Sequence, residues 1–541
     1  MRNRKTVLKS LLLILAFVVS LFAGISNTYA ATGTENAIAK GGNAYSNGQR
    51  SKYETIQFVA FNDFHGNVES LGSNPGIAKI AGVLDQMKTE YPTFFFSAGD
   101  NFQGTAISNL THGKVVNDAF QLMDLQASAI GNHEYDWGKD MMYDWSEEGG
   151  YPFLASNIVY KDSGEPVDYA DPYMIKKVRL TSGKVVEIGI IGIATPETAT
   201  KTAAANVADI EFTDPVKATK HWVKYLREVK KVDAVVALTH LGGYQDSSTG
   251  EVTGELKDYA DHISGVDLIF SGHTHQTIDA VVNGIQILQG RYNGRSLQVA
   301  RLTFNNRNTK LESIDGFIDP ISTRIASLPV NQEVADLVAG YKADLADVLN
   351  EYVGMNAQLL EHDTTGPLGL TPLGQWTAKA LSELGGTQIA IINGGGIREP
   401  MPAGEITMGI MYKLFPFDNT LVTLKVTGAK LYELIEHGIE EGTFKDGQFY
   451  GVKVKVDLSK PYGSRIVEMT LQNGDPIDNA ALYSVSTLDF VYTGGDKYNF
   501  TGAIDVVDTF IPVRDKLAQY IRSLPRQTLI HAFDASAYVV Q

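Results

Sequence analysis

Short apolar runs alternate with longer stretches of helical spacing in the first part of the chain. The helical stretches, Ile77–Tyr91 and Pro215–Val229, repeat apolar residues every three or four positions, and Asp214 can cap the second one. Such alternation is typical of an α/β domain, which we place at residues 54–325. The runs predicted as strands are Ile56–Phe61, Phe94–Phe96, Val186–Ile193, Ala234–Leu238, Leu268–Phe270, Ile285–Leu288 and, as the last strand, Val299–Phe304.

A single long helix is predicted between this domain and a second one. Asn331–Val353 has apolar residues at helical spacing and either connects two domains or opens the second; we assign residues 326–354 as a connecting helix. Residues 355–541 are then a second α/β domain, and no internal repeat relates the two. Its predicted elements are helices at Trp376–Leu384, Lys430–Ile439 and Asp515–Ile521, strands at Ile389–Ile392 and Leu421–Val426, and β-rich sequence to about Val491.

The N-terminus has the pattern of a secretory signal. Basic residues at positions 2, 4, 5 and 9 precede an apolar run from Leu11 to about Ile25, and small residues end at Ala30. The run is short for a membrane anchor, so we predict cleavage after Ala30 and no membrane span in the mature chain. Residues 31–53 are rich in Gly, Asn, Ser and Ala and are predicted to be a flexible leader.

Composition narrows the class of partner and the compartment. The 541-residue chain has 44% hydrophobic residues and a net charge of −16, which excludes binding of nucleic acid polymers through surface charge. A small anionic substrate remains possible if metal ions supply local positive charge. The chain has no cysteine and therefore no disulfide or thiolate ligand. Export from a single-membrane bacterium, to the medium or the cell wall, fits this composition.

The first candidate site follows the apolar run Ala127–Ile130. It reads Gly131-Asn132-His133-Glu134-Tyr135-Asp136. Asn132 offers a carbonyl oxygen to a metal, His133 can protonate a leaving group, and Asp136 can orient and charge-stabilise that imidazole. Alone, this segment is equally compatible with a turn carrying a solvated histidine.

Four other segments share this design, in which an apolar strand is followed by side chains that can bind metal. Five of the 11 histidines fall at such strand ends, which favours a site over packing. Ligands two residues apart point the same way if the backbone stays extended. The oxygen and imidazole ligands suit zinc, manganese or iron. These ligands are Asp63 and His65, Asp100, His240, and His273 and His275.

The ordered motifs D-x-H, G-D-N, G-N-H-E, H and G-H-x-H resemble those of the calcineurin-like metallophosphoesterases. With Asp136 and the second-domain segment Asn393-Gly394-Gly395-Gly396-Ile397-Arg398, the chain resembles a secreted bacterial 5′-nucleotidase across residues 55 to 510. The resemblance implies a four-layer α/β/β/α sandwich followed by an α/β substrate-specificity domain. It also implies two divalent metal ions, zinc, manganese or similar.

The resemblance also assigns the metal ligands. One ion would take Asp63, His65, Asp100 and His275, and the other Asp100, Asn132, His240 and His273, with Asp100 bridging. Two such cations would activate a bridging hydroxide and clamp the phosphoryl oxygens for in-line displacement. His133, held by Asp136, would assist the leaving alkoxide.

The second domain is implied to bind the nucleoside. Glycines after Ile389–Ile392, Gly395 among them, bring bare backbone close to a ligand or make a tight turn. Arg398 is suited to bidentate phosphate contact. By the resemblance, Asn393 meets the nucleoside, Phe417 and Phe490 sandwich the base, and Asp496 binds the ribose hydroxyls; as isolated residues, both phenylalanines would more often be core side chains.

One departure leaves the substrate open. Family members commonly carry an arginine before the helix that begins near Leu373, but residues 364–372 contain no basic residue. We therefore predict a nucleoside 5′-monophosphate hydrolase and keep a 2′,3′-cyclic-nucleotide phosphodiesterase/3′-nucleotidase or a UDP-sugar hydrolase as alternatives. A non-catalytic surface binding module is the alternative from another class. No P-loop is present.

Overall fold

The computed structural model describes residues 51–363, 369–439 and 447–540. The predicted signal at 1–30 and the leader up to residue 50 lie outside these ranges. Tyr53, placed in the leader by the sequence pattern, is instead the first residue of a strand. Part of the segment without a basic residue, 364–368, also lies outside the described residues.

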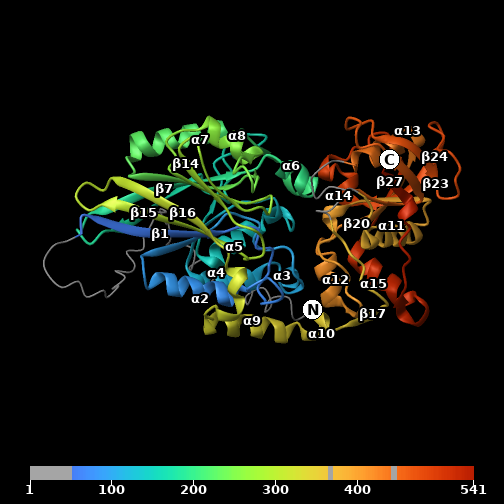
Figure 1. Cartoon of the computed structure of the whole chain (residues 1–541), viewed down its shortest axis with the longest axis horizontal. Helices are drawn as coiled ribbons and strands as arrows, with labels where there is room; N and C mark the ends of the chain where they lie inside the picture. The colour runs from blue at the N-terminus through green and yellow to red at the C-terminus, as the bar shows by residue number, and fades with distance from the viewer. Residues whose placement is uncertain (1–50, 364–368, 440–446, 541) are drawn as a thin grey trace, which may run out of the picture. The chain divides into compact units, whose positions relative to one another are not determined.

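Two six-stranded mixed sheets form the first domain (Figure 1). In order across the first sheet, the strands are β16 (Leu311–Asp319), β15 (Leu297–Asn305), β1 (Tyr53–Phe61), β2 (Thr93–Ser97), β3 (Leu125–Ala129) and β4 (Phe153–Leu154). In order across the second, they are β13 (Ile278–Val282), β14 (Ile285–Gln289), β12 (Leu268–Ser271), β9 (Ala234–His240), β7 (Val185–Ala194) and β6 (Tyr173–Arg179).

Apolar side chains from both sheets pack between them, and helices cover the outer faces. Phe58, Phe96 and Phe270 are among the residues buried between the sheets. Helices α7 (Pro215–Lys224) and α8 (Glu255–His262) cover the second sheet, while α2 (Ile77–Lys88), α4 (Lys114–Met123) and α5 (Met141–Gly149) cover the first. The predicted four-layer α/β/β/α order is confirmed.

The central strands of each sheet are parallel. β1, β2 and β3 run parallel in one sheet, and β7, β9, β12 and β14 in the other. The carboxyl ends of parallel strands lie at one edge, where open α/β sheets bind ligands. All five predicted strand-end motifs follow β1, β2, β3, β9 and β12, so the topology brings them to the sheet edges from which a site can be built.

The structure corrects two expectations near the end of this domain. Val299–Phe304 lies in β15, but it is not the last strand, because β16 follows as its antiparallel partner. The single helix predicted over Asn331–Val353 is two helices, α9 (Gln332–Asp344) and α10 (Ala346–Leu349), and Tyr352 already begins strand β17 (Tyr352–Asn356). Leu345 separates the helices with a non-helical backbone.

Helix α9 packs on the first domain. Val334 and Val338 are buried with residues of α2 and α4 in one apolar cluster. The Asn331 side chain caps the helix by accepting a hydrogen bond from the Val334 backbone N–H at 3.1 Å. The helix is therefore part of this domain's packing and not a free connector.

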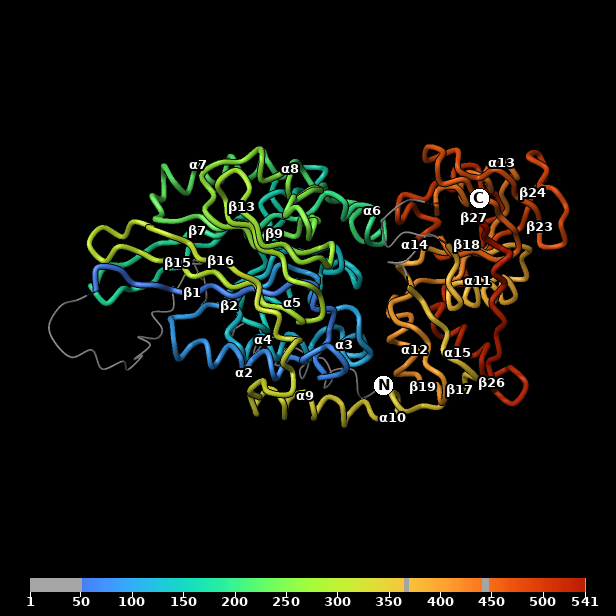
Figure 2. The backbone as a smooth tube through the Cα atoms, viewed as in Figure 1, coloured from blue at the N-terminus to red at the C-terminus, as the bar shows by residue number. Residues whose placement is uncertain are grey.

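A five-stranded sheet forms the centre of the second domain, which the chain enters after completing the first (Figure 2, orange to red). Its strand order is β21 (Gly447–Tyr450), β18 (Ile389–Asn393), β24 (Leu482–Leu488), β20 (Thr420–Thr427) and β25 (Ile504–Pro512). The predicted helices are confirmed as α11 (Pro372–Gly385), α13 (Gly428–His437) and α15 (Val513–Ser523). Their apolar faces share one core with this sheet.

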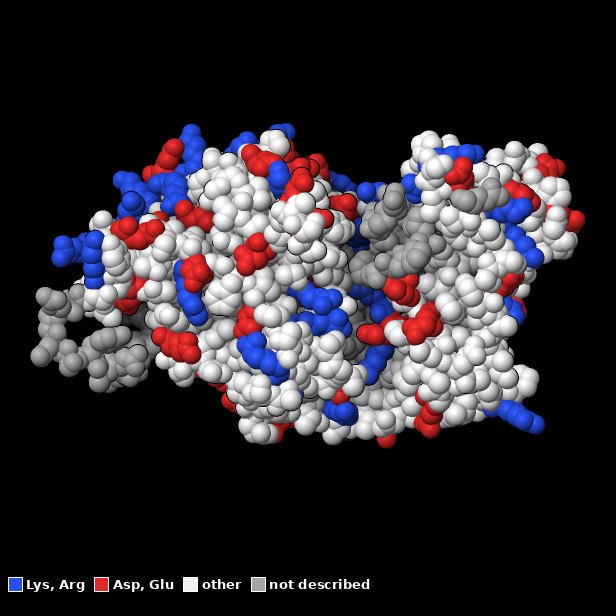
Figure 3. Space-filling model, in the orientation of Figure 1, with Lys and Arg blue, Asp and Glu red and all other residues white. Residues whose placement is uncertain are grey.

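On the face shown in Figure 3, acidic and basic side chains are interspersed. Within the part of the chain that the structure describes, no helix combines the length and apolar character needed to cross a membrane.

We predict that the layer between the two sheets is the main stabilising element of the first domain. Phe58 is fully buried there, with its ring centroid 4.9 Å from that of Phe96. Phe58→Ala should lower the free energy of unfolding by about 3–5 kcal/mol, measured by urea denaturation. Val281→Ala is the control: its side chain is 65% exposed on β13, so its effect should stay within about 0.5 kcal/mol. Equal effects of the two substitutions would contradict this packing.

Candidate dimetal active site

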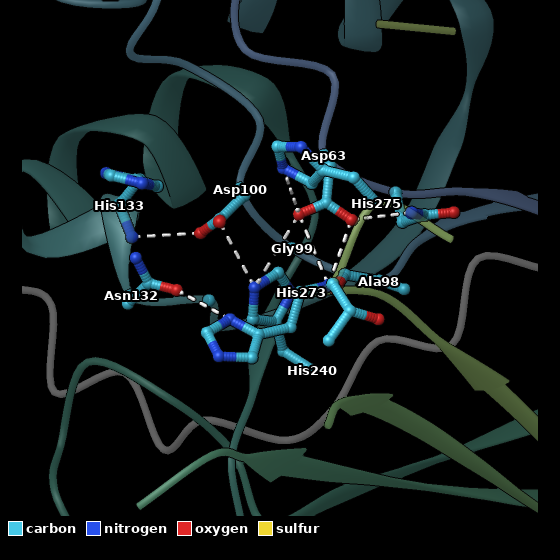
Figure 4. Close-up of polar contacts among 12 residues, drawn as sticks. Asp63, Ala98, Gly99, Asp100, Asn132, His133, His240, His273 and His275 are labelled. Carbon is cyan, nitrogen blue, oxygen red and sulfur yellow. Dashed lines mark hydrogen bonds and ion pairs between the residues drawn. The ribbon is translucent and has the colours of Figure 1, made fainter. Parts of the chain in front are cut away.

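The predicted metal ligands form two clusters at the strand ends (Figure 4). One cluster contains Asp63, His65 and His275, and the other contains Asp100, His240 and His273. In each, one possible ligand atom per residue lies within 4.8 Å of the others. These groupings agree with three members of each ligand set implied by the resemblance; the bridging role of Asp100 stays a prediction.

The first cluster brings together three groups that can each offer a lone pair to one cation. His65 Nδ1 lies 3.1 Å from the Gln103 carbonyl oxygen, so Nδ1 carries the proton and Nε2 has a lone pair. That Nε2 lies 3.2 Å from His275 Nε2. Burial and the neighbouring His275 hold the pKa of His65 well below its usual value. The donor set therefore fits a divalent cation.

The second cluster repeats this chemistry. His240 Nδ1 lies 2.6 Å from the Ala98 carbonyl oxygen, which directs the buried Nε2 lone pair toward Asp100 Oδ2 at 3.1 Å. Burial opposes a charged imidazole, yet the Asp100 carboxylate raises the pKa of His240 to about 10. A proton takes this position when no metal does. The site thus requires positive charge, and oxygen and imidazole ligands suit zinc, manganese or iron.

Left-handed backbone, not an extended conformation, aims five of the six side chains in the two clusters; the sixth, His240, ends strand β9. Positive φ angles occur at Asp63 (49°), His65 (50°), Asp100 (56°), His273 (82°) and His275 (59°). The backbone is not extended at His273 and His275, so the condition under which they would point the same way is not met, and they fall in different clusters, as the resemblance implied. Left-handed backbone at a non-glycine residue is disfavoured and collects at functional sites where surrounding contacts fix it.

Contacts between neighbouring loops supply that constraint. Asp63 N–H donates to the Gly99 carbonyl and His65 N–H to the Asp100 carbonyl, both at 3.0 Å. The loops approach so closely that a Cβ on Gly131 would lie 2.2 Å from Asp100 Oδ1. The glycine of the G-N-H-E motif is therefore needed for close approach of two strand ends.

Glu134, to which the sequence pattern gave no role, connects these loops through its side chain. Its fully buried carboxylate accepts backbone hydrogen bonds from Asp100 at 2.9 Å, Gly131 at 2.7 Å and Asn101 at 2.8 Å. Burial and the charge of Asp100 raise its pKa to about 7. Glu134 thereby ties the loop after β2 to the loop after β3. Its position after His133 was visible in the sequence, but its inward direction was not.

His133 and Asp136 form the expected pair. His133 Nδ1 lies 2.8 Å from Asp136 Oδ2, and the His133 backbone N–H donates to Asp100 Oδ1 at 2.9 Å. Burial opposes the imidazolium, but the carboxylates of Asp136 and Asp100 raise the pKa of His133. The pair is arranged to hold a proton beside the second cluster.

Asn132 and the previously unassigned Glu197 both contact His273. Asn132 Oδ1 lies 3.0 Å from His273 Nδ1, as expected if both atoms face the same cation. His273 Nε2 lies 3.2 Å from Glu197 Oε2. Carboxylates commonly orient metal-binding histidines through the other ring nitrogen. Only the fold brings Glu197 here, since it lies 76 residues from His273.

A cavity of about 250 Å³ joins this region to the predicted nucleoside site. Its lining includes all six residues predicted to bind substrate, together with Asn132, His133 and Asp136. The six are Asn393, Gly395, Arg398, Phe417, Phe490 and Asp496. Neither phenylalanine is a fully buried core residue, and both line this cavity, although Phe490 also packs on the core of the second domain.

Arg398 lines the cavity beside Phe417, which in turn stacks on His133. Its guanidinium carbon is 5.8 Å from the Phe417 ring centroid, and the Phe417 ring stacks on His133 with centroids 5.5 Å apart. Burial lowers the pKa of Arg398, while Asp100 and Asp63 act in the opposite direction. A phosphate between Arg398 and the clusters would be held from both sides.

Lys201 is a cavity residue that sequence reasoning missed. Its Nζ lies 2.7 Å from Asp496 Oδ1, while Asn393 Nδ2 donates to Asp496 Oδ2 at 2.7 Å. Both carboxylate oxygens of Asp496 are therefore engaged. A lysine in a short helix, α6 (Thr198–Lys201), carries no motif that would have revealed this role.

Comparisons with known proteins match this architecture. Residues 56–277 match the family model described as calcineurin-like phosphoesterase, and residues 355–503 match the 5′-nucleotidase C-terminal domain. The chain belongs to these metallophosphoesterase and 5′-nucleotidase families, which are hydrolases acting on phosphoric esters. The alternative of a non-catalytic binding module is accordingly set aside. Calcineurin-like phosphoesterases use two divalent metals, and the two clusters are where this chain has suitable ligands.

Individual relatives show how far the similarity extends. The chain is 29% identical over 463 residues to the Trifunctional nucleotide phosphoesterase protein YfkN of Bacillus subtilis, covering 75% of this chain but 30% of that protein. It thus spans less than a third of that relative's length. It is 26% identical to Protein UshA of Yersinia enterocolitica, covering 87% of this chain and 92% of that protein.

A solved structure shares the fold across both domains. The 5′-nucleotidase precursor from Thermus thermophilus superposes with a TM-score of 0.77 at 23% sequence identity, covering 90% of this chain and 99% of that one.

Glu134 provides a direct test of how the loops support the metal clusters. Glu134→Gln keeps the size but replaces one acceptor oxygen by an NH₂ group facing backbone donors. We expect a roughly 10- to 100-fold loss of affinity for Mn²⁺, measured by titration calorimetry after chelation. Glu148→Gln, at an exposed position, should retain normal affinity. Unchanged affinity in Glu134→Gln would show that the loops keep their conformation without the Glu134 carboxylate.

Proposed function

We propose that this protein hydrolyses nucleoside 5′-monophosphates, releasing phosphate and nucleoside. The observation that carries the proposal is the single cavity lined by the His133–Asp136 pair and by all six residues predicted to bind a nucleotide. A phosphomonoester of a nucleoside has the two parts that such a cavity can hold, an anionic group at the clusters and an aromatic base against phenylalanine.

The contacts in the cavity suggest a separate role for each group of residues. Two divalent metals, when bound, supply Lewis acidity toward the phosphoryl group and its attacking oxygen. Arg398 would bind phosphoryl oxygens, while Asn393, Asp496 and the two phenylalanines position the nucleoside. His133, oriented by Asp136 Oδ2 at 2.8 Å, would deliver its proton to the leaving 5′-oxygen.

The cation content of the cavity favours one phosphate. Among its described lining residues, Arg398 and Lys201 are the arginine and the lysine, beside the His133 imidazole assigned to the leaving group, and Lys201 is paired with Asp496 at 2.7 Å. Residues 364–372 contribute no arginine by sequence. A monophosphate therefore matches the available positive charge better than a nucleoside diphosphate or a UDP-sugar. Because the missing arginine leaves the phosphate with fewer contacts, cyclic nucleotides are also included in the substrate panel.

Export of the protein is proposed on the signal pattern of residues 1–30. We infer that the mature chain acts outside the cell or at the cell wall. Mass spectrometry of the secreted protein tests this assignment, with an N-terminus at Ala31 expected.

A substrate panel tests the proposal. The Mn²⁺-loaded protein should release phosphate fastest from AMP, more slowly from UDP-glucose and 2′,3′-cyclic AMP. His133→Ala should lower kcat on AMP by roughly a hundred- to ten-thousand-fold with metal content unchanged. Preference for a cyclic nucleotide or UDP-glucose would replace the proposed substrate by that class. Loss of metal in His133→Ala would instead place His133 among the ligands.

The two aromatic residues test nucleoside recognition separately from hydrolysis. Each stacking face is worth about 1–3 kcal/mol by analogy with bases stacked on aromatic side chains. Exchanging both Phe417 and Phe490 for Ala should lower kcat/KM for AMP by roughly ten- to a thousand-fold. Hydrolysis of methyl phosphate, which has no base, should change little.

The control measurement is the melting temperature of the doubly substituted protein. If both substrates lose activity and the protein melts earlier, the phenylalanines are core residues. If neither substrate is affected, the base does not bind between them.

A further inference from the structure

The turn that carries Asp496 has an unfavourable backbone. Asp496 and Lys497 have φ angles of 50° and 63°, a left-handed conformation that non-glycine residues rarely adopt, and still more rarely in succession. Lys497 N–H donates to the Gly494 carbonyl at 3.0 Å, but this bond is local to the turn. Holding the Asp496 carboxylate in the cavity therefore requires contacts from elsewhere in the domain.

His437, the last residue of α13, provides such a contact. Its Nε2 lies 2.8 Å from the Asp496 carbonyl oxygen. A carbonyl oxygen only accepts, so Nε2 carries the proton, and in the neutral imidazole Nδ1 has the lone pair. The Tyr462 hydroxyl lies 2.8 Å from Nδ1 and can donate to it. The two bonds together select one tautomer and one ring orientation.

Packing completes the support of this ring. His437 stands edge-to-face on Tyr498, with ring centroids 4.5 Å apart and an interplanar angle of 75°. Tyr498 follows the turn directly and is buried. His437 is not among the residues lining the cavity, so its influence on a ligand must pass through Asp496.

We propose that His437, held by Tyr462, is a positioning residue for recognition of the ribose diol. This inference rests on the proposed function, in which Asp496 binds the ribose hydroxyls. His437 fixes the backbone of the turn, and Asn393 fixes the side chain through its 2.7 Å hydrogen bond to Asp496 Oδ2. Without His437 the turn loses its backbone anchor, and Asn393 and Lys201, which contact only the carboxylate, no longer hold it where both ribose hydroxyls can donate to it. The defect should appear in nucleotide binding and not in the chemical step, because the metal clusters belong to the other domain.

The experiment compares AMP with 2′,3′-dideoxy-AMP in the metal-loaded protein. His437→Leu should raise KM for AMP roughly 10- to 100-fold, the range for losing hydrogen bonds to a charged group, while kcat stays within about twofold. KM for dideoxy-AMP should hardly change, because that ligand has no diol. His437→Gln, whose amide can donate to the Asp496 carbonyl, should restore part of the AMP affinity. Tyr462→Phe should raise KM for AMP by about 2- to 10-fold.

Tyr432→Phe is the matched control. Tyr432 lies on the same helix, and its hydroxyl donates to the Met469 carbonyl at 3.3 Å without contacting the turn. It should leave the KM values for both nucleotides unchanged. A purely structural role for His437 predicts equal losses on AMP, dideoxy-AMP and p-nitrophenyl phosphate with a lowered melting temperature, and that result would overturn the inference.

The wild-type protein separates this inference from the proposed function. Hydrolysis of p-nitrophenyl phosphate without hydrolysis of AMP overturns the proposed function and the inference with it. A wild-type preference for AMP over dideoxy-AMP that survives in His437→Leu overturns only the role of His437.

Discussion

Attraction between buried anionic or lone-pair groups and positive charge is the interaction on which this site depends. Asp63, Asp100 and His240 are all at most 2% exposed. Burying a carboxylate without a compensating charge costs several kcal/mol. The imidazoles of His275 and His240 outweigh burial and hold the pKa values of Asp63 and Asp100 below the usual range. Divalent cations satisfy the same requirement more completely.

The fold meets this requirement through the order of its parallel strands and through left-handed backbone at most of the ligand residues. Parallel strands in two packed sheets bring five strand ends to one region, and left-handed backbone turns Asp63, His65, Asp100, His273 and His275 inward. Close packing of those loops leaves no room for a Cβ at Gly131, and the Glu134 carboxylate satisfies the backbone donors that the packing buries. A rigid set of ligands results, to which the second domain adds a place for the nucleoside.

Prediction from the sequence succeeded for the parts of the fold and the site that are marked by particular residue types. Apolar runs gave the central strands, and histidines and aspartates after them gave the two clusters. It failed where geometry alone decides: the backbone at Asp63 and His275 is left-handed although neither is glycine, and the helix predicted over Asn331–Val353 breaks at Leu345 and gives way to a strand. Glu197, Lys201 and His437 have no motif because their partners are brought to them from distant parts of the chain. Glu134 belongs to the G-N-H-E motif, but nothing in the neighbouring sequence indicates that its side chain points inward.

A crystal structure with Mn²⁺, adenosine and phosphate tests the central claim most directly, since anomalous scattering locates the metals independently of any assumption about ligands. We expect two manganese peaks, one among Asp63, His65 and His275 and one among Asp100, His240 and His273. Adenine should lie against Phe417 and Phe490, in the cavity that holds His133. A single peak, peaks away from these residues, or adenosine bound outside the cavity would contradict the proposed dimetal nucleotide site.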